Sequence, residues 1–235
     1  MPGRCINFKV SGQQLPNRSA LNAIMANASI LESMAMNKKT LSTRQIINRI
    51  YKDIEGFEIP SIDAKRVRES KGSPIYGEIN HEALNKLLKY LRLGPKDVFF
   101  DLGSGVGKVI TQTLLTTPVK LAVGVELSKI RHHDARLAMK RAYDFDPSIK
   151  NRVRLLNKDL LTVDLHEATV IYTCSTAFSQ LFMKKLTKRL QSFNHHFILV
   201  SLQDLPEIPE FKLIKKLKLD MSWLKCTPVY IYQRS

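Results

Sequence analysis

The sequence predicts an α/β fold with a Rossmann-like, mostly parallel sheet of seven strands, a terminal antiparallel hairpin and a small N-terminal helical segment. Three observations indicate this class. Apolar strand-like runs alternate with segments of helical periodicity, as in a parallel sheet with crossover helices. A glycine-rich turn joins the first of these strands to a helix within residues 98–109. The last two predicted strands follow one another without a helix, as in a hairpin.

The chain is predicted to divide into an accessory segment, residues 1–75, and an α/β domain, residues 76–235. Glycine and proline without a period indicate a loosely held arm over residues 1–18. Apolar residues at helical spacing predict a helix over 19–36. The stretch 42–45, Ser-Thr-Arg-Gln, is a capping-box pattern that begins a second amphipathic helix.

The remaining elements follow from glycine, proline and apolar periodicity. Residues 54–75 hold two glycines and two prolines around the basic centre Lys65-Arg66-Val67-Arg68, so a loop is expected there. Helices are expected over 81–93 and 177–191. A further helix should follow the glycine-rich turn and end near residue 116, and another should begin after a cap at Ser128. Strands are expected from residue 98 and over 120–126, 153–156, 168–173, 197–201, 211–219 and 229–232.

Composition limits the compartment and the partners. No secretory signal is visible in the first twenty residues, and no run approaches the roughly 20 apolar residues of a membrane span. Three dispersed cysteines predict free thiols, with no structural disulfide or zinc and no metal site. We therefore expect an intracellular protein, cytoplasmic by default with the nucleus as the alternative. The net charge of +16 favours an acidic or nucleoprotein partner and no membrane, and we expect a monomer.

The glycine-rich turn carries the first chemical signal. Gly103, Gly105 and Gly107 let the backbone approach a ligand, and the following helix presents free N–H groups to it. The Gly-Lys-Ser/Thr of a P-loop is absent, and Lys108 stands where a dinucleotide fingerprint needs its third glycine. The remaining pattern, Asp101-x-Gly-x-Gly-x-Gly, is typical of S-adenosylmethionine-dependent methyltransferases.

Two further acids support that cofactor. Glu126 follows Asp101 by 25 residues and ends the next predicted strand, where a carboxylate can accept both hydroxyls of a ribose. Asp159 follows the third strand, and we expect it to accept from the exocyclic amine of adenine. Asp101 is expected to hold the glycine turn and to approach the amino end of S-adenosylmethionine.

A resemblance to a known family appears at Ile75-Tyr76-Gly77-Glu78-Ile79. A Tyr-Gly-Glu loop, a helix and then Asp-Leu-Gly-Ser-Gly-Val-Gly resemble the disruptor-of-telomeric-silencing family, the histone lysine methyltransferases that lack a SET domain. The similarity covers about residues 74–233, and it continues through residues 157–161, 170–172, 177–178, 222–223 and 228–232. It implies that residues 76–235 form the S-adenosylmethionine-dependent methyltransferase domain.

The resemblance also implies the roles of individual residues. Cofactor contacts are implied for Tyr76, Glu78, Asp101, Gly103, Gly105, Lys108, Glu126, Asp159 and Leu160. Tyr76, Cys174 and Phe178 are implied around the methyl donor and the lysine channel. Cys174 stands where the family has an asparagine, and Ile79 where it has a threonine. Trp223 is expected to be a core residue.

The resemblance therefore implies methyl transfer to a protein lysine, on a histone-like substrate. The ε-amine of lysine has an ordinary pKa near 10.4, and burial beside the sulfonium lowers it, so that no dedicated general base is required. The stretch 173–176 lacks the proline and aromatic residues of enzymes that methylate a base amine. The alternatives are an RNA- or ribosome-directed methyltransferase, which the charge favours, and a catalytically silent cofactor-binding scaffold, which the loss of the asparagine favours.

Overall fold

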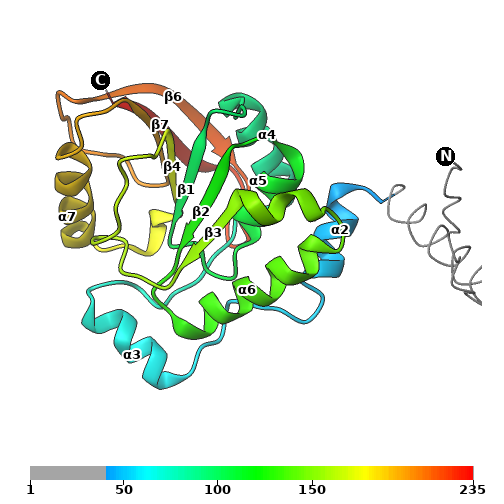
Figure 1. Ribbon diagram of the computed structural model, residues 1–235. Helices are drawn as coiled ribbons and strands as arrows, with labels where there is room; N and C mark the ends of the chain where they lie inside the picture. Colours follow the sequence, from blue (N-terminus) through cyan, green and yellow to red (C-terminus); the bar gives the residue numbers. More distant parts are fainter. Residues whose placement is uncertain (1–40, 235) are drawn as a thin grey trace, which may run out of the picture. The chain divides into compact units, whose positions relative to one another are not determined.

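The computed structural model describes residues 41–234 (Figure 1). The arm predicted over 1–18 and the helix predicted over 19–36 lie outside this range. Ser42 to the C-terminus belongs to one compact unit, and Ile47, Ile50 and Ile54 are part of its core. The division of the chain at residues 75 and 76 falls inside this unit and stays a prediction.

Seven strands form one sheet in the order β3-β2-β1-β4-β5-β7-β6. The five strands from β3 to β5 are parallel, whereas β7 runs antiparallel to both of its neighbours. This arrangement confirms the predicted Rossmann-like sheet and its terminal hairpin. The bounds are β1 Val98–Leu102, β2 Leu121–Val125, β3 Val153–Leu156, β4 Val170–Thr173, β5 Phe197–Ser201, β6 Phe211–Leu219 and β7 Thr227–Arg234.

Each face of the sheet is buried by a different set of helices (Figure 1). Along β1, Phe99 points into the core on one face and Phe100 into the core on the other, as the two-residue period of a strand requires. The first face is covered by α2 (Thr43–Ile50), α4 (His81–Leu91), α5 (Lys108–Thr116), α6 (Lys129–Tyr143) and the short η1 (Pro147–Arg152). The second is covered by α7 (Gln180–Gln191) and residues 160–168.

Two predicted helix starts are confirmed by their caps. The side chain of Ser42 accepts from the backbone N–H of Gln45, and the Gln45 side chain accepts in return from the N–H of Ser42. The side chain of Ser128 accepts from the N–H of Arg131 at the start of α6. These contacts satisfy N–H groups that have no partner inside the helix, so the local sequence determines where both helices begin.

The loop predicted over residues 54–75 is wrong in its centre, because helix α3 occupies Ser61–Glu69. Pro60 precedes its first turn, where a missing N–H costs nothing. Ala64 and Val67 are buried, and Asp63 is buried against the start of α6. Residues 56–76, which contain α3 and its flanking turns, are called the strap below.

Within the part of the chain that the structure describes, no helix combines the length and the apolar character needed to cross a bilayer. The same residues contain no cluster of histidine, cysteine, aspartate or glutamate able to hold a metal ion. Cys174 and Cys226 are both free thiols, the first half-buried and the second exposed.

Candidate active site

Two adjoining cavities open at the carboxyl ends of β1, β2 and β4. The first has a volume of about 350 Å³ and is lined by Glu126, Asp159, Leu160 and Phe178. The second, of about 470 Å³, contains Glu78, Asp101 and Lys108. Both volumes are in the range of small-molecule sites. The cavities share Tyr76, Gly77, Gly103 and Cys174, so every predicted site residue except the buried Gly105 lines one cavity or the other.

The glycine turn adopts the backbone that its sequence predicts. Gly103, Gly105 and Gly107 have φ values of 89°, 54° and 83°. The N–H groups of Gly103 and Ser104 both donate to the carbonyl of Val125, which ties the turn to the end of β2. A Cβ on Gly105 would lie 2.3 Å from the ring of Tyr76. The turn therefore needs glycine here for its conformation and for the close approach of the ring.

Glu126 is fixed by backbone donors at the end of β2. Its Oε2 accepts from the N–H of Gly105 at 2.8 Å, and its Oε1 accepts from the N–H of Ser128 at 2.7 Å. Burial raises the pKa of this carboxyl, while those two amides and Arg131 act in the opposite direction. A carboxylate has about four acceptor positions, so Glu126 keeps acceptor capacity on the side that lines the cavity.

Asp101 is the unsatisfied acid of the site. The residue is 2% exposed, and its Oδ1 has no hydrogen-bond partner among the described residues. Burial, with a further contribution from the charge of Glu126, raises the pKa of Asp101 to about 8. A buried polar atom without a partner is costly, so this position is suited to a ligand that brings a positively charged donor.

Three side chains form a chain of contacts in the second cavity. The Tyr76 hydroxyl donates to Oε1 of Glu78 at 2.8 Å, and Nζ of Lys108 lies 2.7 Å from Oε2. The half-buried pair of Lys108 and Glu78 joins the Tyr-Gly-Glu loop to the first turn of α5. Ser222 exchanges two hydrogen bonds with the backbone of Glu78, at 2.7 Å and 3.1 Å. The Tyr-Gly-Glu loop is therefore held from both sides.

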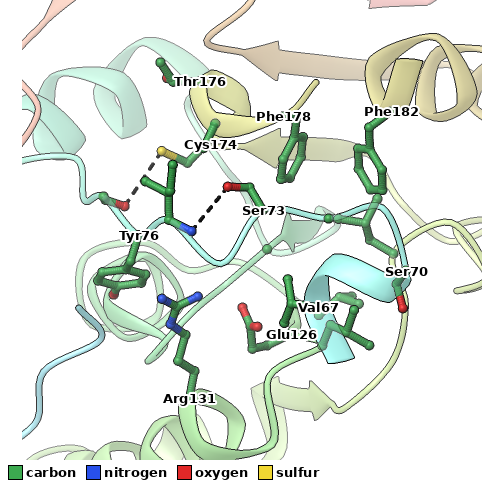
Figure 2. A pocket seen from close by; sticks show the side chains of 18 of the residues that line it. Val67, Ser70, Ser73, Tyr76, Glu126, Arg131, Cys174, Thr176, Phe178 and Phe182 are labelled. Atoms are coloured by element: carbon green, nitrogen blue, oxygen red, sulfur yellow. Dashed lines mark hydrogen bonds between the residues drawn. The ribbon is translucent and has the colours of Figure 1, made fainter. Parts of the chain in front are cut away.

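Cys174 and Phe178 lie beyond β4 and flank the short η2 (Ser175–Ala177), the first before it and the second after it. The thiol of Cys174 donates to the carbonyl of Gly77 at 3.8 Å, a weak contact. Burial, with the charge of Asp101 second, raises the pKa of Cys174 to about 12, so the thiol is neutral at physiological pH. Phe178 packs edge-on against Phe182 of α7 with ring centroids 4.8 Å apart and forms an apolar wall (Figure 2).

Several residues of the cleft were not identified from the sequence. Val67 and Ser70 of the strap and Arg131 of α6 line the first cavity (Figure 2). Trp223 also lines it and is 43% exposed, so its prediction as a core residue is wrong. A Cβ on Gly77 would lie 2.3 Å from the Trp223 ring, and the glycine beside Tyr76 was the available signal for such a contact. No sequence signal marked Arg131, which lies in the first turn of α6.

The sheet order and the helices on its two faces are those of the class I methyltransferase fold. A solved structure described as an RNA methyltransferase from Salinibacter ruber in complex with S-adenosyl-L-homocysteine shares this fold. Its TM-score is 0.51 at 22% identity, over 65% of this chain and 90% of that chain. The buried unpaired carboxyl of Asp101 and the backbone-held Glu126 fit a cofactor with an ammonium group and a ribose.

The family follows from residues 59–221, which match the family described as "Histone methylation protein DOT1". The chain belongs to this family, which uses S-adenosylmethionine. A relative in Caenorhabditis elegans, "Histone-lysine N-methyltransferase, H3 lysine-79 specific", is 32% identical over 152 residues, 61% of this chain and 16% of the relative. A "Protein-lysine N-methyltransferase" of Saccharolobus islandicus is 26% identical over 47% of this chain and 66% of its own length. The chain thus spans about a sixth of the first relative.

Proposed function

We propose that this chain is an S-adenosylmethionine-dependent protein-lysine N-methyltransferase. The observation that carries the proposal is the convergence of Asp101, Glu126 and Asp159, from the ends of three parallel strands, on cavities joined at the glycine turn. Membership of the family supports lysine as the acceptor. We also propose that residues 76–235 form the catalytic domain and that residues 1–75 serve it as an accessory segment.

The cofactor would extend across both cavities. Glu126 would accept from the ribose hydroxyls, and Asp159 with Leu160 would contact the adenine. Asp101 would pair with the ammonium group in the second cavity, beside the glycine turn at Gly103 and Gly105. Glu78, Lys108 and Tyr76 would complete that end, with the charge of Lys108 suited to a carboxylate.

S-adenosylmethionine supplies a methyl group activated by a sulfonium charge. The chain's own contribution is to position the acceptor amine and to exclude water from it. Tyr76 and Phe178 provide walls that desolvate the amine and lower its pKa towards the neutral, reactive form. Cys174 is shared by both cavities and lies at their junction. Because its thiol is neutral, it adds no charge beside the amine, and no side chain needs to act as a general base.

We propose that the substrate is a protein of the histone type and that the chain methylates it within a nucleoprotein. The relatives in C. elegans and S. islandicus are both named as enzymes that act on a protein lysine. The net charge of +16 favours a polyanionic partner. Nuclear action and a monomeric state are parts of the same proposal.

Parallel methyl-transfer assays test the function. Purified chain and tritiated S-adenosylmethionine are incubated with nucleosomes, free histones, total cell protein and RNA, and label is located by mass spectrometry. We expect label on lysine side chains of protein. Label confined to RNA would select the RNA-directed alternative, and cofactor binding without transfer to any fraction would select the silent scaffold.

A conservative variant of Glu126 tests the proposed placement of the cofactor. Glu126→Gln keeps the volume of the side chain and removes the charge that holds the turn and the ribose. We expect it to lose S-adenosylhomocysteine binding in calorimetry together with all methyl transfer. Transfer at the wild-type rate by Glu126→Gln would contradict the placement of the cofactor.

A further inference from the structure

Arg131 is a buried cation whose hydrogen bonds go to the backbone of the strap. It is 3% exposed on the inner side of α6. Its Nε donates to the carbonyl of Gly56 at 2.8 Å, and its Nη2 donates to the carbonyl of Pro74 at 2.7 Å. These two carbonyls lie near the two ends of the strap, so one planar guanidinium joins both ends to α6. Donation in two directions from a fixed fork is a property of arginine that lysine lacks.

The same guanidinium lies over the ring of Tyr76, at 4.8 Å from its centroid (Figure 2). Phe57 meets that ring edge-on at 5.2 Å. A Cβ on Gly56 would lie 2.4 Å from the ring, so the strap backbone touches Tyr76 directly. Tyr76 is thus packed by Arg131 and by the beginning of the strap while it lines both cavities.

A second contact fixes the middle of the strap. Asp63 of α3 accepts from the hydroxyl of Ser128, and from the N–H groups of Lys129 at 3.2 Å and Ile130 at 3.3 Å. The acid therefore caps the N-terminus of α6, where a negative charge is favourable. Val67, one helical turn further on, lines the first cavity. Helix α6 consequently holds the wall of the cofactor cleft at three points.

We infer that Arg131 is a positioning residue that holds the strap and Tyr76 closed over the cofactor cleft, and that it thereby sets how long the cofactor is retained. The inference rests on the proposed function. Arg131 contacts the strap and Tyr76 rather than the reacting atoms, so it acts on the affinity for the cofactor and not on the chemical step. No pattern in the sequence announces this role, since its partners are two main-chain carbonyls.

The first experiment measures cofactor release. S-adenosylhomocysteine binding and dissociation are followed by calorimetry and stopped-flow in wild type, Arg131→Lys and Arg131→Gln. Both variants should release the ligand at least tenfold faster, because neither can bond both carbonyls and cover the Tyr76 ring. In turnover with the acceptor found above, KM for S-adenosylmethionine should rise by a similar factor, and kcat at saturating cofactor should stay within about twofold. Arg136→Gln, on the exposed side of α6, is the matched control and should behave as wild type.

The second experiment reads the strap directly. Four trypsin sites lie in it: Lys65, Arg66, Arg68 and Lys71. S-adenosylhomocysteine should protect these sites in wild type and Arg136→Gln. In Arg131→Lys they should be cut faster, with little protection by the ligand. If the Arg131 variants do not fold, Asp63→Asn tests the same strap through its other anchor and should also accelerate release.

Three results would overturn the inference. Arg131→Lys with wild-type release would show that charge alone suffices, and a fall in kcat at unchanged KM would place Arg131 in the chemical step. Unchanged release in Asp63→Asn would show that the strap does not retain the cofactor. If wild type itself binds no S-adenosylhomocysteine, the proposed function fails. The role of Arg131 in holding the strap is then tested by tryptic cleavage of the ligand-free proteins.

Discussion

On the proposed function, the buried carboxyl of Asp101 should make cofactor binding depend on pH. In the free chain the pKa of Asp101 is raised to about 8 by burial and by the charge of Glu126. At pH 6 the carboxyl is therefore almost entirely protonated. An ammonium group in the second cavity pairs only with the ionised form, so binding must release a proton. Cofactor affinity should increase as the pH rises towards 8.

The magnitude follows from the fraction of chains that are competent to bind. With a pKa of about 8, the factor 1 + 10^(pKa − pH) is about 100 at pH 6 and about 2 at pH 8. The dissociation constant for S-adenosylhomocysteine should therefore fall about 50-fold between these values. Asp101→Asn keeps the shape of the side chain and cannot ionise, so it should bind weakly with a flat profile.

Calorimetry measures both the affinity and the proton. Titrations at pH 6, 7 and 8 are repeated in buffers of different ionisation enthalpy, which reports the protons released on binding. The ligand's own amine titrates equally in wild type and Asp101→Asn, so the difference between the two profiles isolates the carboxyl. Equal profiles, or binding at pH 6 without proton release in wild type, would refute the reasoning.

The same carboxyl affects folding. In the unfolded chain it ionises near its ordinary pKa of 3.8, whereas in the folded chain it stays protonated up to about pH 8. The folded state thus binds more protons between these values, and its free energy of unfolding should fall as the pH rises through this window. Asp101→Asn should remove that slope in chemical denaturation, and an unchanged slope would contradict the assignment.

Further predictions concern the turn, the ion pair and the thiol. Gly105→Ala should destabilise the fold by about 1–3 kcal/mol and abolish S-adenosylhomocysteine binding, because φ is 54° and the new Cβ meets a ring; wild-type calorimetry would contradict this. Lys108→Met should weaken cofactor binding at least tenfold, and it should also destabilise the fold because it leaves the carboxylate of Glu78 without its partner. In a double-mutant cycle, adding Glu78→Gln to Lys108→Met should restore part of that stability. Iodoacetamide at pH 7.5 should label the exposed Cys226 faster than Cys174, by peptide mass spectrometry, because burial keeps Cys174 protonated.

The sequence was most informative where a short stretch determines its own geometry. The glycine turn needs positive φ at fixed positions, and the caps at Ser42 and Ser128 are local hydrogen bonds, so all three could be predicted. The positions of Asp101 and Glu126 at the ends of β1 and β2 could be predicted from the spacing of the two strands. Their roles towards a cofactor stay predictions until binding is measured.

The strap and its partners could not be predicted for a physical reason. Helix α3 is short and is held by Asp63 against the end of a distant helix. Arg131 bonds main-chain carbonyls, which look the same at every position of a sequence. Trp223 is exposed beside Gly77 because the cleft opens there. Each depends on contacts between segments far apart in the chain.

The shape of the cleft depends on atoms that three glycines lack. Gly56 and Gly105 make room for the ring of Tyr76, and Gly77 makes room for the ring of Trp223. Each glycine and the ring that it faces therefore form a steric pair, in which the residue type at one position limits the residue types allowed at the other during evolution. A relative with a smaller side chain in place of Tyr76 could accept alanine at position 56, where no unusual φ is required. Among divergent relatives, loss of such a glycine should therefore be accompanied by loss of its ring, and the remaining cleft would be wider.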